Sequence, residues 1–224
     1  MNAHAPAAVL WDMDGTLIDS EPYWIAAEIE LCARFGVEWT HEDGIRQVGN
    51  PLTKTGTELR QRGVHLPIET IVEHLSGRVT MQIREHAPWQ ADAFDLLTKV
   101  LAAGIPCALV TMSYRGMADA LLARVPDAFA AVVTGDEVVN GKPHPEAFLL
   151  AATRLGVDIT KCVAFEDSPA GVGAALASGA RTVGIQRIVP VAPAEGLSRM
   201  TSLAGLTVAD ISEIANGRVI DQLA

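Results

Sequence analysis

Short apolar runs that alternate with helical patterns are the feature that most constrains the fold of this chain. The runs lie at 7–12, 106–110, 130–133, 161–165 and 181–185. Each has the length of a buried strand, and most of the intervening stretches carry apolar residues at helical spacing. Continuous apolar runs of this kind are typical of parallel strands that are covered on both faces. We therefore expect an α/β fold, with a doubly wound parallel sheet between two layers of helices.

The alternation breaks once, directly after the first run. Between 21 and 86, helical patterns follow one another without a strand pattern, and Pro88 marks the return to alternation. The chain of 224 residues is long enough for one core and an inserted module. We therefore predict an α/β core made of residues 1–18 and 87–224, with a helical insertion at 19–86.

The composition narrows the classes of partner. The formal net charge of −10 argues against a broad nucleic-acid or anionic-membrane surface. The three cysteines are odd in number and lack metal-ligand spacing, so we expect free, buried thiols in a reducing cytoplasm. No apolar run is long enough to span a bilayer, and a monomer is the default expectation.

Two carboxylates stand one residue apart where the first run ends. In the segment Asp12-Met13-Asp14-Gly15-Thr16, strand alternation should point Asp12 and Asp14 to one side and Met13 to the other. Two acids on one side repel each other, and the arrangement is costly unless a cation or a shared proton compensates. A polar exit into a turn is the bland alternative, since Asp, Gly and Thr all suit turns.

Other polar residues follow later runs. In open parallel sheets, ligands bind at the carboxyl ends of the strands, and that edge should also receive Thr111, Ser113, Glu166 and Asp167. A Gly-Lys-Pro-His-Pro loop delivers the ammonium group of Lys142 shortly before a helix. Four carboxylates, hydroxyl groups and one lysine are therefore expected at one edge.

The chemistry of this donor set favours magnesium and phosphate. Hard oxygen ligands suit Mg²⁺, and no Cys or His cluster supports zinc. A magnesium ion with a lysine is a means of holding phosphate. One carboxylate can accept a phosphoryl group as an aspartyl phosphate, while a second transfers protons to the leaving oxygen and from the attacking water.

These segments, in this order, resemble the haloacid dehalogenase superfamily, in its magnesium-dependent phosphatase branch with a small helical cap after the first strand. The resemblance covers essentially the whole chain and implies a Rossmann-like core. It makes Asp12 the nucleophile and Asp14 the general acid/base. Thr111 would hydrogen-bond the transferring phosphoryl group, and Lys142 would neutralise its charge and orient Asp12.

The resemblance also implies a metal site and a phosphate cradle. Magnesium would bind the Asp12 carboxylate, the backbone carbonyl of Asp14, and Asp167, with Glu166 binding it directly or through water. Backbone N–H groups would cradle the phosphate, and the substrate-binding residues expected in the core are Met13, Gly15, Met112 and Ser113. In the insertion, Asn50 and Lys54 are the candidate substrate contacts.

The implied function is hydrolysis of small phosphorylated metabolites, with sugar phosphates as the default class. A mutase similar to β-phosphoglucomutase is the alternative, although the arginine-bearing cap loop of that subgroup is absent and 48–52 occupies its region. A non-enzymatic phospho-acceptor would also gather acids, a hydroxyl group and a lysine. The length of the chain, its early insertion and Asp14 argue against this third reading.

Overall fold

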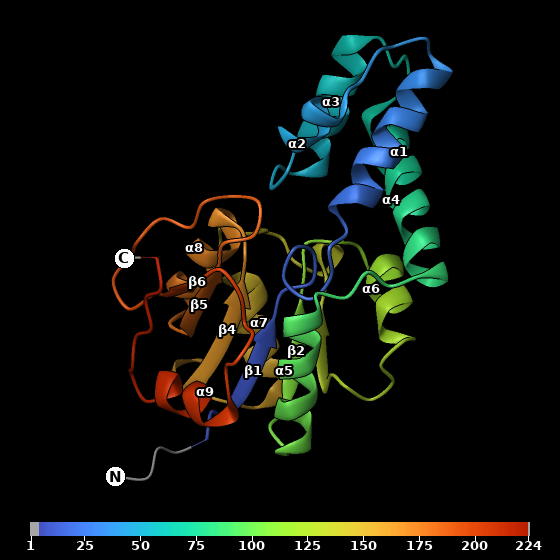
Figure 1. Cartoon of the computed structure of the whole chain (residues 1–224). Coiled ribbons are helices and arrows are strands. Elements are labelled where there is room, and N and C mark those ends of the chain that lie inside the picture. Colours follow the sequence, from blue (N-terminus) through green and yellow to red (C-terminus); the bar gives the residue numbers. More distant parts are fainter. Residues whose placement is uncertain (1–4, 224) are drawn as a thin grey trace.

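A six-stranded parallel sheet with the order β3-β2-β1-β4-β5-β6 forms the centre of the protein (Figure 1). The structure is a computed structural model and describes residues 5–223. The strands are β1 Ala8–Trp11, β2 Cys107–Val110, β3 Ala131–Val133, β4 Cys162–Glu166, β5 Arg181–Ile185 and β6 Ser198–Met200. The sheet therefore confirms the α/β class, and β1 lies between β2 and β4.

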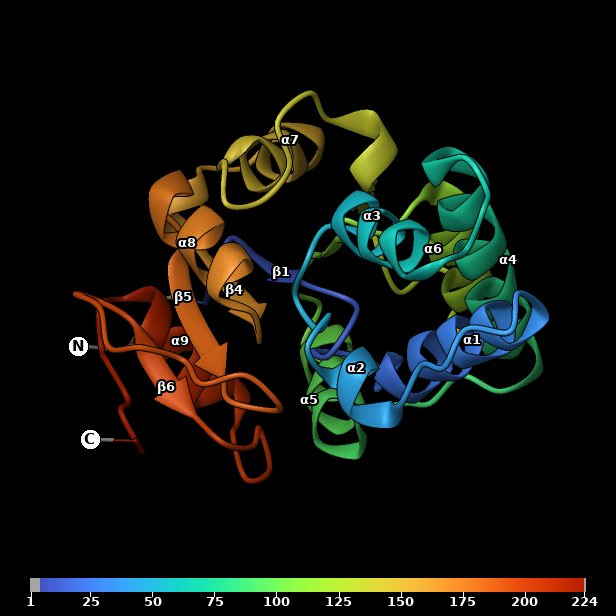
Figure 2. The ribbon, with the colours of Figure 1, turned by 90° about the horizontal axis from the view of Figure 1, so that it is seen from above.

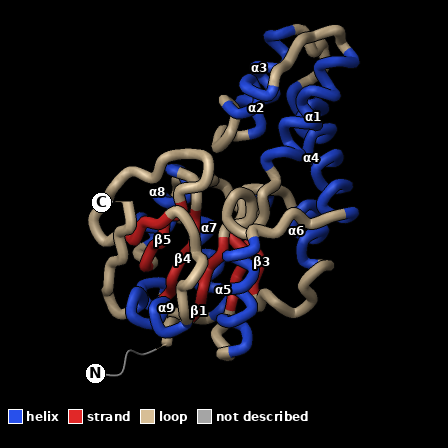
Figure 3. Tube along the Cα trace, viewed as in Figure 1, coloured by secondary structure: helices blue, strands red, loops and turns tan. Residues whose placement is uncertain are grey.

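Helices cover both faces of the sheet. One face packs against α5 Ala91–Ala102, α6 Arg115–Leu122 and α9 Val208–Ala215, and the other against α7 Glu146–Leu155 and α8 Pro169–Ser178. Short 3₁₀ helices at Gly135–Glu137 and Ile159–Lys161 lie in the connections. Figure 3 shows the strands enclosed between these helices.

Strand β1 shows why its sequence is apolar throughout. Val9 and Trp11 point into the core under α5 and α6, whereas Ala8 and Leu10 point into the core under α7 and α8. All four side chains are fully buried. The Trp11 ring stacks on Phe165 of the adjacent strand, with ring centroids 4.6 Å apart. This packing fixes the strand from which the acidic segment emerges.

Four further helices project from the carboxyl edge of the sheet (Figures 1 and 2). They are α1 Glu21–Arg34, α2 His41–Ile45, α3 Leu52–Arg62 and α4 Ile68–Glu85. Two linkers join them to the core and pair with each other, because Asp19 N–H donates to Pro88 O (2.8 Å) and Gln90 N–H donates to Leu17 O (2.9 Å). The division into a core and a cap domain stays a prediction.

One strand and one α-helix have no counterpart in the sequence analysis. Strand β6 has only three residues, Ser-Arg-Met, which lack the apolar run that marks the other strands. Its backbone also pairs with the C-terminal segment, since Arg199 N–H donates to Ile220 O at 2.8 Å. Helix α2 is five residues long and is held by a capping box between Thr40 and Asp43.

The cysteines and the helices agree with two expectations from composition. Cys32, Cys107 and Cys162 are buried and free, as predicted. Across residues 5–223, no helix combines the length and the apolar character that a membrane crossing requires.

Asp92, in the first turn of α5, ties together the loops that follow β5 and β6. Its carboxylate accepts hydrogen bonds from Arg187 Nη2 (2.7 Å), Ser202 Oγ (2.6 Å) and Leu203 N–H (2.7 Å). Burial opposes the charge on this carboxylate, but the three donors outweigh burial and lower the pKa of Asp92 to about 2. The ionised form therefore stabilises the folded state.

Asp92→Asn should lower the free energy of unfolding at pH 7 by about 2 kcal/mol, because the amide lacks the charge that the three donors stabilise. The folded-state pKa is the lower one, so this stabilisation is complete above the unfolded value of 3.8 and fades as the pH falls toward 2. Urea unfolding at pH 7 and pH 3 measures both effects. Asp95→Asn, at an exposed position that pairs with Lys99 on the same helix, is the matched control. A gap between wild type and Asp92→Asn that does not narrow at pH 3 would contradict this account.

Candidate active site

The ammonium group of Lys142 lies at the centre of the acidic residues at the carboxyl edge. Its Nζ donates to Asp12 Oδ1 at 2.6 Å, Glu166 Oε1 at 2.5 Å and the Val110 carbonyl at 2.9 Å. Burial opposes its charge, but Asp12 and Glu166 outweigh burial and raise the pKa of Lys142. The lysine is therefore a permanent cation between Asp12, which follows β1, and the last residues of β2 and β4.

Three carboxylates gather around this cation. Asp12, Glu166 and Asp167 each offer an oxygen atom within 4.8 Å of the others. Burial, together with the charge of Asp12, raises the pKa of Glu166 and of Asp167, although Lys142 opposes the shift. Asp12 Oδ2 is buried and has no hydrogen-bond donor among the described residues.

This donor set fits a magnesium ion. The available atoms are hard carboxylate oxygens, one of them buried without a donor, and their mutual repulsion exceeds what a single lysine offsets. A divalent cation at these carboxylates would offset the repulsion that adds to the effect of burial on the pKa values of Glu166 and Asp167. The residues that would hold it are Asp12, Glu166 and Asp167.

Glycines make room for two of these acids. A Cβ atom on Gly171 would lie 2.0 Å from the Glu166 carboxylate, which sits against the first turn of α8 and accepts the Asp167 N–H at 3.2 Å. A Cβ atom on Gly15 would lie 1.9 Å from Asp167 Oδ2, and Gly15 also has a φ of +86°. Both positions therefore require glycine for the acids to keep their places.

Asp14 lies among hydroxyl groups rather than in the acid cluster. Its carboxylate accepts from Ser20 Oγ at 2.6 Å, Ser113 Oγ at 2.7 Å and Thr111 Oγ1 at 3.3 Å. Burial raises the pKa of Asp14 and the nearby charge of Asp12 adds to the shift, while the hydroxyl donors oppose it. Burial thus favours the protonated form of Asp14, which is the form that a general acid needs.

Ser20 is the one Asp14 partner that the sequence analysis did not single out. It occupies the N-cap position of α1, yet its hydroxyl group makes no bond to that helix. The sequence feature that could have pointed to Ser20 is its position directly beside the acidic motif, although serine there is also a good helix-capping residue. Only the structure shows that its hydroxyl group is used by Asp14 instead.

Some of the backbone N–H groups expected to hold phosphate already donate hydrogen bonds within the protein, and others do not. Gly15 N–H donates to Ile18 O at 2.8 Å, and Ser113 N–H donates to Thr111 Oγ1 at 2.9 Å. Among the described residues, no acceptor meets the N–H groups of Met13, Asp14 and Met112. The Met13 side chain is fully buried in the core, opposite to the acids, as strand alternation predicts.

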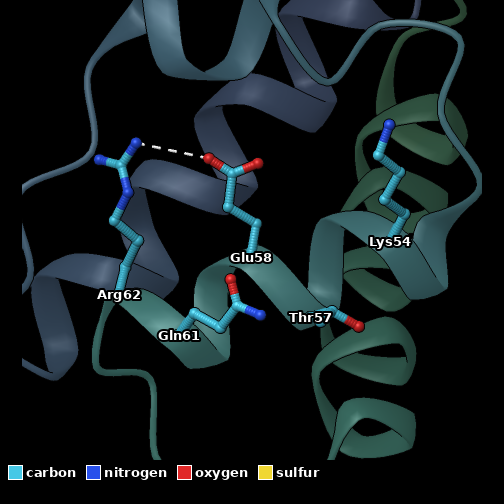
Figure 4. A pocket seen from close by; sticks show the side chains of 5 residues that line it. All are labelled: Lys54, Thr57, Glu58, Gln61 and Arg62. Atoms are coloured by element: carbon cyan, nitrogen blue, oxygen red, sulfur yellow. Dashed lines mark hydrogen bonds and ion pairs between the residues drawn. The ribbon is translucent and has the colours of Figure 1, made fainter.

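The insertion residues lie apart from this cluster. Lys54 Nζ donates to Asn50 Oδ1 at 2.9 Å, and no hydrogen bond or ion pair in residues 5–223 joins either residue to the core. Lys54 also lines a hollow of about 400 Å³ on the surface of α3 (Figure 4). Its other lining residues are Thr57, Glu58, Gln61 and Arg62.

Known proteins are similar to this chain in sequence and in architecture. Hexitol phosphatase B of Escherichia coli O157:H7 is 28% identical over 212 residues, which cover 92% of this chain and 93% of that protein. Fructose-1-phosphate phosphatase YqaB of E. coli K12 is 32% identical over 185 residues, covering 80% and 96%. The crystal structure of a putative β-phosphoglucomutase from Thermotoga maritima matches with a TM-score of 0.71 and 28% identity, covering 93% of this chain and 96% of that one.

The family assignment follows from the extent of the match. The model of the haloacid dehalogenase-like hydrolases matches residues 6–179, a span that contains Asp12, Lys142 and Glu166. The same span holds four of the five strands that the sequence predicted, and the fifth, β5, begins just after it. The chain belongs to the haloacid dehalogenase-like hydrolase family.

Proposed function

We propose that this protein is a magnesium-dependent phosphatase of small phosphorylated metabolites, with sugar phosphates as its substrates. The observation that carries the proposal is the buried contact of Lys142 with Asp12 and Glu166, which leaves Asp12 Oδ2 without a donor. One carboxylate oxygen is thus oriented by a cation while the other is free to react. A protonatable second acid, Asp14, lies two residues along the chain.

In the first half of the reaction, Asp12 attacks the phosphorus atom of the substrate. A bond forms between the Asp12 carboxylate and phosphorus, and the bond from phosphorus to the sugar oxygen breaks. Asp14 gives its proton to that oxygen, which leaves as an alcohol. Lys142, the Thr111 hydroxyl group and free backbone N–H groups hold the phosphoryl oxygens.

In the second half, water removes the phosphoryl group from Asp12. The ionised Asp14 takes a proton from the attacking water, the bond between phosphorus and the Asp12 oxygen breaks, and inorganic phosphate leaves. Asp14 is then protonated again and the site is ready for another substrate. The three hydroxyl groups around Asp14 keep its carboxyl group within the site between the two steps.

Magnesium, when bound, supplies positive charge that offsets the charge of the phosphoryl group and of the acids. Asp12, Glu166 and Asp167 would hold it through their carboxylates, and Asp14 through its backbone carbonyl. Glu166 and Asp167 take no further part in the reaction.

One observation supports sugar phosphates as the substrate class, and a second supports substrates with a single phosphate group. The relatives named above carry the names of a hexitol phosphatase and a fructose-1-phosphate phosphatase. The buried core site holds a single lysine, which suits one phosphate group, and the cationic insertion residues Arg46 and Lys54 are already paired with neighbours.

A sugar-phosphate mutase is the second candidate, because a putative β-phosphoglucomutase shares the architecture. Incubation with β-glucose 1-phosphate and magnesium distinguishes the two. Release of inorganic phosphate supports the phosphatase, whereas accumulation of glucose 6-phosphate would replace it with the mutase.

Asp12→Asn should lower magnesium-dependent phosphate release from fructose 1-phosphate by about 10⁴-fold or more, because the amide cannot form the phospho-enzyme. The isosteric change should leave the protein folded, and the presence of a cooperative unfolding transition checks this. Asp95→Asn, which alters an exposed acid on α5, is the control and should keep full activity. Substantial turnover by Asp12→Asn would refute the nucleophile assignment.

Asp14→Asn should separate the two halves of the reaction. With p-nitrophenyl phosphate, whose leaving group needs no proton, a rapid-mixing experiment should show a burst of one equivalent of nitrophenolate followed by slow turnover. With fructose 1-phosphate, release of the sugar should itself fall by about 10²- to 10⁴-fold, without a burst. An equal loss in both halves with both substrates would count against Asp14 as the proton-transfer group.

Asp167→Asn should remove the response of the protein to magnesium. Metal-free Asp167→Asn should melt about 3 °C above the metal-free wild type, because one of three mutually repelling acids is neutralised. Millimolar MgCl₂ should raise the melting temperature of the wild type and of Asp95→Asn but not that of Asp167→Asn. A normal magnesium response in Asp167→Asn would place the metal elsewhere.

A further inference from the structure

The side chain of Met112 makes a specific contact with the loop that carries Lys142. The backbone N–H of Lys142 donates to Met112 Sδ, with an N–S distance of 3.3 Å. Met112 is half-buried and packs against the core under α7 and α8. The family resemblance accounts for a backbone N–H at this position, but it assigns nothing to the side chain.

Lys142 is thereby attached to the end of β2 at two points. Its ammonium group donates to the Val110 carbonyl at 2.9 Å, and its backbone N–H donates to Met112 Sδ two residues further on. Gly141 allows the close approach, since a Cβ atom there would lie 3.1 Å from the same sulfur. The two contacts fix both the backbone and the tip of a long, flexible side chain relative to one strand.

Methionine is suited to this contact. Its unbranched side chain fills irregular gaps, and its thioether sulfur is a weak hydrogen-bond acceptor. Leucine has a similar volume but offers no acceptor. A glutamine side chain offers an amide oxygen at similar reach, at the cost of a polar group in partly apolar surroundings.

We propose that the Met112 side chain is a positioning residue for Lys142, holding its backbone through the thioether so that its ammonium group spans Asp12 and Glu166. This inference rests on the proposed phosphatase function for its kinetic readout, but not for its structural one. Distances of 2.6 and 2.5 Å to the two carboxylates leave little tolerance for a shifted loop. Small misplacements of catalytic groups carry large losses in rate.

The kinetic experiment compares Met112→Leu, Met112→Gln and the control Met117→Leu, which makes the same change at a buried site on α6. With p-nitrophenyl phosphate and MgCl₂, Met112→Leu should lose about 3- to 10-fold in kcat, the fold-change expected for one hydrogen bond. Inhibition by inorganic phosphate should weaken by a similar factor. Met112→Gln should recover at least half of the lost kcat, and Met117→Leu should stay within about twofold of wild type.

The order of the two Met112 variants decides between positioning and packing. If Met112 only fills space, the apolar Met112→Leu should match wild type and the polar Met112→Gln should be the worse enzyme. That order would overturn the proposal. Urea unfolding of each variant ensures that the comparison is made on folded protein.

A second readout is independent of turnover. Hydrogen exchange of the Lys142 amide, followed by NMR, should be at least about threefold faster in Met112→Leu than in wild type, and protected again in Met112→Gln. Unchanged exchange in Met112→Leu would overturn the proposal. If the wild type hydrolyses no phosphate ester, the proposed function fails, while the exchange rates still decide the role of Met112.

Discussion

The buried contact of Lys142 with Asp12 and Glu166 is the interaction on which the site depends. The three residues come from distant parts of the chain, and they meet only because β1 lies between β2 and β4 in the sheet. Two anions alone at this depth would disfavour folding, and one cation between them removes much of that cost. The order of the strands therefore determines which charged groups meet at the carboxyl edge of the sheet.

Lys142 offsets only part of the negative charge around it. The charge that is left over determines what the site can bind. Asp167 and the second oxygen of Asp12 lie beside the contact without a cation of their own, so burial and repulsion favour protonation or metal binding. Asp14 is handled differently, because hydroxyl groups surround it and none of them carries charge. Asp12 and Asp14 thus have different environments although they are two residues apart.

Sequence reasoning reached the fold and the identity of the clustered residues, for physical reasons. Continuous apolar runs mark strands buried on both faces, and the ends of parallel strands share an edge, so Asp12, Glu166 and Lys142 could be placed together in advance. Strand β6 could not be predicted, because its three residues include a serine and an arginine and form no apolar run. The use of the Ser20 hydroxyl group and of the Gly15 N–H depends on local three-dimensional geometry, which no spacing rule encodes.

The paired linkers have a consequence for how such a protein can diversify. The chain leaves the core and returns to it at neighbouring points, which the Asp19–Pro88 and Gln90–Leu17 hydrogen bonds join. Within the described part of the chain, the insertion therefore contributes no strand to the sheet and lies between two adjacent points of the core. Its length and sequence can change without altering the register of any strand. Hydrolases that descend from one ancestor can therefore differ in the insertion, and so in the substrates they bind, while they keep the same reacting residues in the core.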